Sequence, residues 1–159
     1  YWHYNDAVCR GEVSLDELNR VWAERLGIMV DWQYYYLQAV DKMPGIGGLV
    51  DWVAQRYLIG ILTNTMPGFV GALQGKGDIP PVQYNSIVDS SVVHALKPEQ
   101  QIFETAAVQA GVEPHEILLI DDDRANLAAA DKLGWRTIWF DAYQPEESIE
   151  AIRLSLEPA

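Results

Sequence analysis

Apolar positions in the first part of the chain recur at the spacing of an amphipathic helix. One such run, with members three or four residues apart, consists of Leu15, Leu18, Val21, Trp22 and Leu26. Ser14 and Glu17 stand at its start in the Ser-x-x-Glu order of a capping box, in which each side chain binds a backbone amide of the first turn. The pattern therefore predicts a helix that begins after Ser14 and ends near Gly27.

A second helix is predicted to begin after Asp31 and to end before Pro44 and Gly45. The residues expected on its apolar side are Trp32, Tyr35, Tyr36, Ala39 and Val40. We expect the two helices to pack antiparallel, and a pair this small cannot fold alone, so its apolar face must rest on the remaining chain. The predicted division is a partial helical subdomain over residues 1–43 and a core over residues 44–159.

After Pro44 the pattern changes to short apolar runs that alternate with helical stretches. The runs predicted as strands are YLIGILTN (57–64), SIVDS (86–90), ILLID (117–121) and TIWF (137–140). The helices predicted around them span 46–56, 68–74, 98–110, 125–133 and 145–156. This alternation is typical of a parallel sheet with helices on both faces, so the predicted fold class is α/β and Rossmann-like.

Charge and composition narrow the possible partners. Eleven basic residues against 23 acidic ones give a net charge of -12, which argues against nucleic acid or an anionic membrane surface as the main partner. An anionic substrate would therefore need a local cation or metal at its site. No apolar run approaches the roughly 18 to 20 residues that cross a bilayer. The lone Cys9, expected to be an unreactive packed side chain, favours a reducing, cytoplasmic setting.

Candidate chemistry lies at the carboxyl ends of the predicted strands, where ligands bind in open α/β sheets. The first strand ends in Thr63, Asn64 and Thr65, which offer a hydroxyl, a carboxamide and free backbone amides to a phosphate oxygen. The alternative is that Thr or Asn simply caps the next helix. Lys97 directly precedes Pro98, a residue suited to the first turn of a helix. Its ammonium could neutralise a carboxylate and a phosphoryl group, although a lone Lys is also a common surface residue.

Three consecutive carboxylates, Asp121, Asp122 and Asp123, follow the buried strand ILLID. Such charges repel one another unless a cation or a basic side chain lies among them. Mg²⁺ fits this need, because it prefers a few carboxylate oxygens, several waters and a phosphate oxygen. The alternative is a solvated acidic turn that leads into a helix N-terminus, where negative charge is favourable.

In this order, the segments ILTNT, LKPEQQIFETA and LLIDDDRANLAAADKLGWRTI resemble the second, third and fourth motifs of the haloacid-dehalogenase (HAD) superfamily. The resemblance covers residues 44–140, and the helices before it look like that family's small α-helical cap. The closest likeness is to the phosphatase branch that contains sugar-phosphate phosphatases and the N-terminal phosphatase domain of soluble epoxide hydrolases.

The resemblance implies a role for each matching residue. Thr63 would hydrogen-bond the phosphoryl group, Asn64 would help hold phosphate, and Lys97 would stabilise charge at the nucleophile. Asp122 would bind Mg²⁺ directly, and Asp121 would do so directly or through water. The supporting residues would be Asn126 and Asp123. The implied substrate is a small phosphorylated metabolite, with no nucleic acid or membrane involved.

The family's first motif, an apolar strand that ends in an Asp nucleophile and an acid/base Asp, has no counterpart in these 159 residues. The resemblance places that strand in the middle of the sheet, so we expect the complete protein to carry it upstream of Tyr1. The 159 residues alone are then expected to be inactive.

Three functions follow from this reading. The leading one is a Mg²⁺-dependent phosphomonoester hydrolase that acts through an aspartyl-phosphate. The second is a catalytically silent domain that retains phosphate and metal binding or mediates interactions. The third is a metal-free 2-haloacid dehalogenase on the same fold, against which the carboxylate cluster argues.

Overall fold

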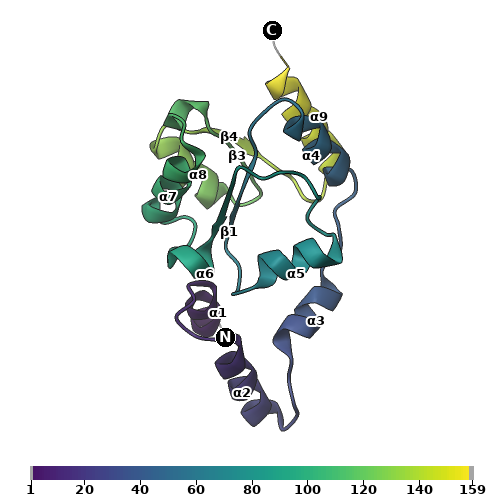
Figure 1. Ribbon diagram of the computed structural model, residues 1–159, viewed down its shortest axis with the longest axis vertical. Coiled ribbons are helices and arrows are strands. Elements are labelled where there is room, and N and C mark those ends of the chain that lie inside the picture. The colour runs from purple at the N-terminus through teal and green to yellow at the C-terminus, as the bar shows by residue number, and fades with distance from the viewer. Residues whose placement is uncertain (1, 158–159) are drawn as a thin grey trace.

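The computed structural model describes residues 2–157, with side chains from Tyr4 onward, and Figure 1 shows how its elements are arranged. The α-helices are α1 (Trp2–Cys9), α2 (Leu15–Leu26), α3 (Trp32–Ala39), α4 (Ile46–Ala54), α5 (Phe69–Lys76), α6 (Ser90–Val93), α7 (Gln100–Ala110), α8 (Arg124–Lys132) and α9 (Pro145–Leu156). The strands are β1 (Gly60–Thr63), β2 (Ser86–Asp89), β3 (Leu118–Asp121) and β4 (Arg136–Trp139), and a 3-10 turn, η1, spans Pro114–Glu116.

Local capping sets both ends of α2 and the start of α3 where the sequence predicts them, whereas α3 ends at Ala39, before the predicted Val40. The hydroxyl of Ser14 accepts a hydrogen bond from the amide of Glu17 at 3.1 Å, and Gly27 ends α2 in the left-handed region with φ 69°. The carboxylate of Asp31 accepts from the amide of Tyr34 at 3.0 Å. These contacts lie within four residues of one another, so the local sequence is enough to specify them.

The packed face of α3 is narrower than predicted. Trp32 stacks on Trp22 of α2, with ring centroids 6.0 Å apart, and Tyr36 packs on Phe69 of α5 at 5.0 Å. Tyr35, which was expected on the same side, is 56% exposed. An eight-residue helix that touches its neighbours through one i, i+4 pair leaves its other aromatic residues in solvent.

Three local details differ from the sequence-based expectation. The helix predicted from Pro98 begins at Gln100, because Glu99 is its N-cap and Pro98 lies in the preceding turn after a cis peptide bond. The short helix α6 directly after β2 and the turn η1 before β3 were not predicted. Both are too short for an apolar repeat to reveal.

The strands form two parallel pairs. β1 pairs with β2 so that Thr63 lies opposite Asp89, and β3 pairs with β4 so that Asp121 lies opposite Trp139. Within residues 2–157 no backbone hydrogen bond joins one pair to the other. The predicted parallel α/β fold is confirmed, and its sheet is divided between β1 and β3.

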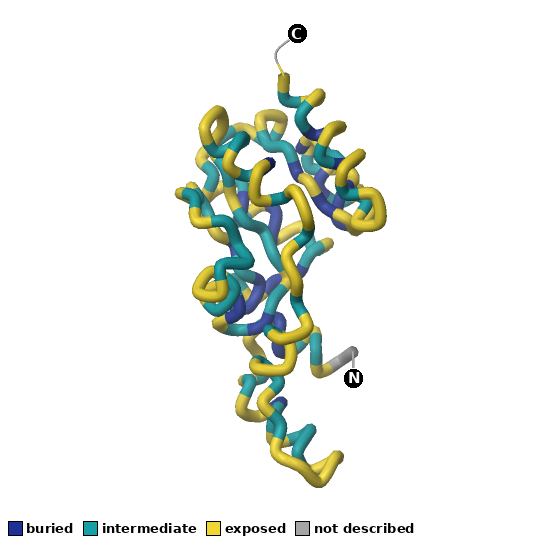
Figure 2. Tube along the Cα trace, turned by 90° about the vertical axis from the view of Figure 1, so that its right-hand side faces the viewer, coloured by how far each residue is buried: buried dark blue, intermediate teal, exposed yellow. Residues whose placement is uncertain are grey.

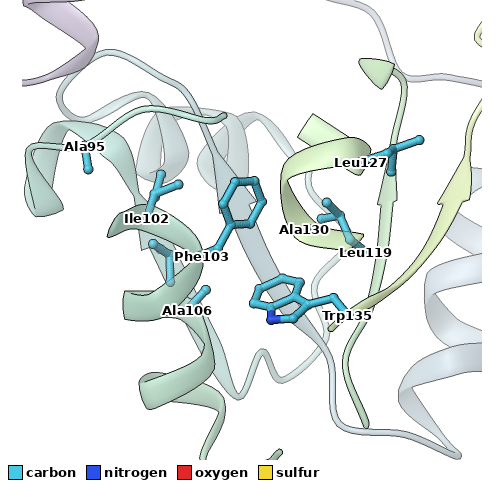
Figure 3. Packing of buried hydrophobic residues seen from close by; sticks show 9 residues of the cluster. Ala95, Ile102, Phe103, Ala106, Leu119, Leu127, Ala130 and Trp135 are labelled. Atoms are coloured by element: carbon cyan, nitrogen blue, oxygen red, sulfur yellow. The ribbon is translucent and has the colours of Figure 1, made fainter. Parts of the chain in front are cut away.

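Helices cover both sides of the strands, with α7 and α8 on one side and α4 and α9 on the other (Figure 1). The largest buried cluster lies under α7 and α8 and consists of Val88, Ala95, Ile102, Phe103, Ala106, Leu119, Leu127, Ala130 and Trp135. Figure 3 shows Phe103 and Trp135 at its centre. Their rings meet edge to face, with centroids 5.5 Å apart, an arrangement that aromatic quadrupoles favour. On the other side, Leu49 of α4, Ile152 of α9 and Phe140 form a separate buried cluster.

A third buried cluster joins the N-terminal helices to the core. Its members are Val8, Cys9, Leu18, Met66, Phe69 and Leu96. Burial and the nearby Asp6 and Asp89 raise the pKa of Cys9 to about 11, so its thiol stays protonated at neutral pH. Buried segments concentrate in the body of the molecule, and the tip where α2 leads into α3 is mostly exposed (Figure 2).

Lys76 of α5 also binds the C-terminal end of α3 through hydrogen bonds. Its ammonium donates to the carbonyl oxygens of Leu37 at 2.7 Å and Val40 at 2.6 Å, and it pairs with Asp78 at 2.9 Å. A cation at the C-terminal end of a helix is favourable there. No helix in the described residues has the length and apolarity needed to cross a membrane.

Candidate functional site

Hydrogen bonds join Asn64, Lys97 and Asp121 near the carboxyl ends of β1 and β3. Thr63 is the last residue of β1 and Asp121 the last of β3, and Lys97 lies in the turn before α7. The ammonium of Lys97 donates to Oδ2 of Asp121 at 2.6 Å, while its backbone is hydrogen-bonded to Asn64. The structure thus brings together residues that are far apart in the sequence.

Asp121 is held by three donors. Oδ2 receives the bond from Lys97, and Oδ1 receives bonds from the amide of Asp123 at 2.8 Å and from Nδ2 of Asn126 at 3.0 Å. The side chain of Asp121 is 4% exposed and that of Lys97 13%. A buried carboxylate is tolerated when it is paired and hydrogen-bonded, so Lys97 is the cation that allows Asp121 to be buried.

Asn64 is directed at the Lys97 backbone. Its Oδ1 accepts from the amide of Lys97 at 2.8 Å, and its Nδ2 donates to the carbonyl oxygen of Lys97 at 2.9 Å. These two hydrogen bonds hold the backbone of the segment that carries the Lys97 ammonium. Asn64 therefore positions Lys97, and it caps no helix.

The loop after β1 offers fewer free amides than expected. The amide of Thr65 donates to the hydroxyl of Ser90 at 2.9 Å, so it is already satisfied. Thr63 is half-buried at the end of its strand. The prediction of free backbone amides is wrong for Thr65, because the hydroxyl of Ser90, the first residue of α6, accepts from its amide.

The three consecutive carboxylates point to different partners. Asp121 pairs with Lys97, and Asp123 is the N-cap of α8, where its Oδ1 accepts from the amide of Ala125 at 2.8 Å. Asp122 is exposed, and its backbone oxygen accepts from Nε1 of Trp139 at 3.0 Å. Among the described residues, no three His, Cys, Asp or Glu side chains are arranged to hold a metal ion together.

Asp121 and Asp122 nevertheless fit a hydrated Mg²⁺. This ion commonly takes one or two carboxylates and completes its octahedron with waters and phosphate oxygens. Asp122 presents an exposed carboxylate at the end of β3, and Asn126 holds Asp121 in place beside it. The ion would neutralise phosphate oxygens in a chain of net charge -12.

A second ion pair stands near the site, between Arg10 after α1 and Glu99 at the start of α7. The Arg10 guanidinium, followed by the hydrogen bond from the Leu96 amide, lowers the pKa of Glu99 below its ordinary 4.5. A depressed carboxyl pKa stabilises the fold above the ordinary value and loses that contribution as the pH falls through the folded value. The pair is partly exposed, so the effect is modest.

We therefore expect the free energy of unfolding to depend less on pH, on the acidic side of neutrality, in Glu99→Gln than in the parent protein. Urea unfolding between pH 3 and pH 7 should show the variant less stable than the parent above about pH 4.5, with the difference shrinking below it. Glu150→Gln, at an exposed glutamate on α9, is the matched control and should follow the parent throughout. A constant difference at every pH would contradict this prediction.

Sequence reasoning missed Ser90, Arg10 and Glu99. Ser90 directly follows β2, so its position at the end of a strand could have identified it as a candidate site residue. Its Oγ bonds to Cys9, 81 residues away, and no local pattern encodes that contact. Arg10 and Glu99 are 89 residues apart, which hides their pairing in the same way.

Comparison with known proteins supports the fold. No protein-family model matches the chain. The chain is 23% identical over 155 residues to acyl-CoA dehydrogenase family member 10 of Mus musculus, a match that covers 92% of this chain and 14% of that protein. The chain therefore spans only a small part of the curated relative's length.

Several solved structures share the architecture. A predicted HAD-like family hydrolase from Porphyromonas gingivalis superposes with a TM-score of 0.79 at 25% identity, over 96% of this chain and 78% of that one. A HAD family enzyme from Bacteroides thetaiotaomicron, in complex with magnesium and inorganic phosphate, gives 0.74 at 21% identity, over 86% and 73%. An L-2-haloacid dehalogenase gives 0.64 at 18% identity, over 89% and 66%.

The superposition spans nearly the whole chain, including the helices before the first strand. The parallel strands, their covering helices and the N-terminal helical segment thus have counterparts in that structure. The chain therefore has the fold of HAD-like hydrolases.

Proposed function

We propose that this chain belongs to a Mg²⁺-dependent phosphomonoester hydrolase that acts on a small phosphorylated metabolite in the cytoplasm. The main support for this proposal is the buried ion pair between Lys97 and Asp121 at the carboxyl ends of β1 and β3. A magnesium and phosphate complex of a protein with this fold supports it. The helices of residues 1–43 would act as the cap over the core of residues 44–159.

Each site residue is assigned a role, and the sequence order and the contacts of Asn64, Lys97, Asp121 and Asn126 support it. Lys97 stabilises negative charge on the nucleophile and the transferring phosphoryl group, and Asn64 holds Lys97 in place by binding its backbone. Thr63 donates to a phosphoryl oxygen. Asp121 and Asp122 would hold Mg²⁺, which would screen the charges of the phosphoryl group. Asn126 braces Asp121, and Asp123 caps α8 beside it.

The nucleophile would be an Asp on a further strand, outside these 159 residues, that lies between β1 and β3. Two observations support this location. The edges of β1 and β3 that face away from their partners make no backbone hydrogen bonds in the described residues. Ile120, in the middle of β3, is 38% exposed, although interior strands of an α/β sheet are buried on both faces. A parallel strand would satisfy these backbone groups.

The chemistry then has two displacements. A carboxylate oxygen of the nucleophile attacks phosphorus, the bond to the alcohol oxygen breaks, and the leaving alcohol takes a proton from a second Asp. Water, deprotonated by that same Asp, then attacks phosphorus of the aspartyl-phosphate. The bond between phosphorus and the carboxylate oxygen breaks, which frees the nucleophile and releases inorganic phosphate. Lys97 balances the charge that develops beside the nucleophile during both steps.

The test is phosphate release by the full-length protein that contains this chain. We expect hydrolysis of p-nitrophenyl phosphate with Mg²⁺ and none with EDTA. Lys97→Met should lower kcat by about 10²–10³-fold, as loss of a charge-stabilising group typically does. Lys132→Met, at an exposed lysine of α8, is the control and should leave kcat unchanged.

Two results would overturn the proposal. Absence of phosphate release from a broad panel of phosphomonoesters would leave a silent binding domain. Chloride release from a 2-chloroalkanoate in EDTA would instead make the protein a dehalogenase.

A further inference from the structure

The C-terminal turn of α1, residues 9–11, is hydrogen-bonded to the segment that follows β2. The carbonyl oxygen of Cys9 accepts a hydrogen bond from the hydroxyl of Ser90 at 2.6 Å. The carbonyl oxygen of Arg10 accepts from Nδ1 of His94 at 2.7 Å. Both bonds satisfy carbonyl groups at a helix end, where intrahelical partners are lacking.

Gly11 allows this turn to approach α6 closely. Its φ is 70°, and a Cβ at this position would overlap the carbonyl oxygen of Ser91. A side chain here would be strained by the backbone conformation and would push the turn away from α6. Gly27 has nearly the same φ, 69°, with nothing within 4 Å of its Cβ position, so it provides a matched comparison.

Ser90 connects this turn to the loop after β1. It is fully buried, and its Oγ accepts from the amide of Thr65 at 2.9 Å while it donates to Cys9. The carbonyl oxygen of Thr65 lies 3.2 Å from the same Oγ. A hydroxyl has one proton, so it can donate fully to only one of these two carbonyl groups.

We propose that Ser90 is a positioning residue that couples the docking of the α1 turn to the conformation of the Thr63–Thr65 loop. When the turn is docked, the Ser90 proton is directed to Cys9. When the turn moves away, the proton turns to the carbonyl oxygen of Thr65, and the loop rearranges around the new bond. Through this coupling, the helices of residues 1–43 influence the loop at the site. The coupling rests on the proposed function in one respect only, the role of this loop in binding phosphate.

The first test perturbs the turn without touching the loop. Amide hydrogen exchange, measured by NMR, should be about tenfold faster at Thr65 in Gly11→Ala, because a buried donor loses its defined partner geometry. Gly27→Ala introduces a comparable backbone strain at the end of α2 and should leave exchange at Thr65 unchanged. Equal exchange rates at Thr65 in Gly11→Ala and the parent would overturn the proposal.

The second test removes the hydroxyl. Ser90→Ala should speed exchange both at Thr65 and in the last turn of α1. Ser148→Ala is the control, because Ser148 is also buried and its Oγ bonds to both the amide and the carbonyl of Asp141. Faster exchange at Thr65 but not in α1 would show that Ser90 serves the loop alone and would overturn the coupling.

The same samples separate this proposal from the proposed function. Titration with inorganic phosphate and Mg²⁺ should shift the loop resonances in the parent and in Ser148→Ala, with about tenfold weaker binding in Ser90→Ala. If phosphate shifts nothing in the parent while the exchange results hold, the coupling stands and phosphate binding by the loop is refuted. If phosphate binds equally well in Ser90→Ala, the loop's geometry does not depend on Ser90 and the proposal fails.

Discussion

Lys97→Met is expected to lower the free energy of unfolding by about 3–5 kcal/mol, the usual cost of leaving one partner of a buried ion pair uncompensated. The reason is the burial of Asp121, whose side chain is 4% exposed. Its remaining donors, the amide of Asp123 and the amide group of Asn126, carry no full positive charge. Urea unfolding at neutral pH measures the effect.

Two further variants show whether the loss comes from the pair. Lys132→Met should change stability by no more than about 0.5 kcal/mol, as an exposed substitution does. Adding Asp121→Asn to Lys97→Met removes the buried charge, so the double variant should lose less than the sum of the two single losses. Strictly additive losses would show that the two side chains do not interact.

Phe103→Ala is expected to cost a similar amount, about 3–5 kcal/mol, through a different mechanism. Phe103 is fully buried at the centre of the largest cluster, and its removal opens a cavity that the surrounding helices and strands can only partly fill. It also removes the edge-to-face contact with Trp135. Thermal unfolding and near-ultraviolet circular dichroism, which reports on Trp packing, measure the loss.

Val108→Ala is the control for Phe103→Ala. Val108 lies on the same helix, α7, and is 81% exposed, so its truncation should change stability by less than about 0.5 kcal/mol. The comparison separates loss of packing from any change in the helix itself. An equal loss in the two variants would contradict the role given to Phe103.

Local features of the chain were predictable because their partners are close in sequence. The helix start at Ser14 depends on an amide three residues away. The end at Gly27 depends on one residue that tolerates a positive φ. The alternation of apolar strands with amphipathic helices likewise predicted a parallel α/β fold, since only crossover helices allow successive strands to be parallel.

Contacts at the site were predictable only in part. The motif residues Asn64, Lys97 and Asp121 could be selected because they stand at strand ends or before a helix. Their partners could not be predicted, because the local sequence around a carboxylate does not indicate which distant cation it will pair with. The sequence suggested a metal among three carboxylates, whereas the structure places the ammonium of Lys97 on the first of them.

The acidic string at residues 121–123 shows this division most clearly. By itself the sequence determined that three negative charges follow a buried strand and that a helix begins directly after them. The tertiary structure alone decided that Asp121 turns inward to Lys97, that Asp122 stays in solvent and that Asp123 caps α8. The physical reason is that burial and ion pairing depend on segments brought together by folding, whereas capping depends on neighbours along the chain.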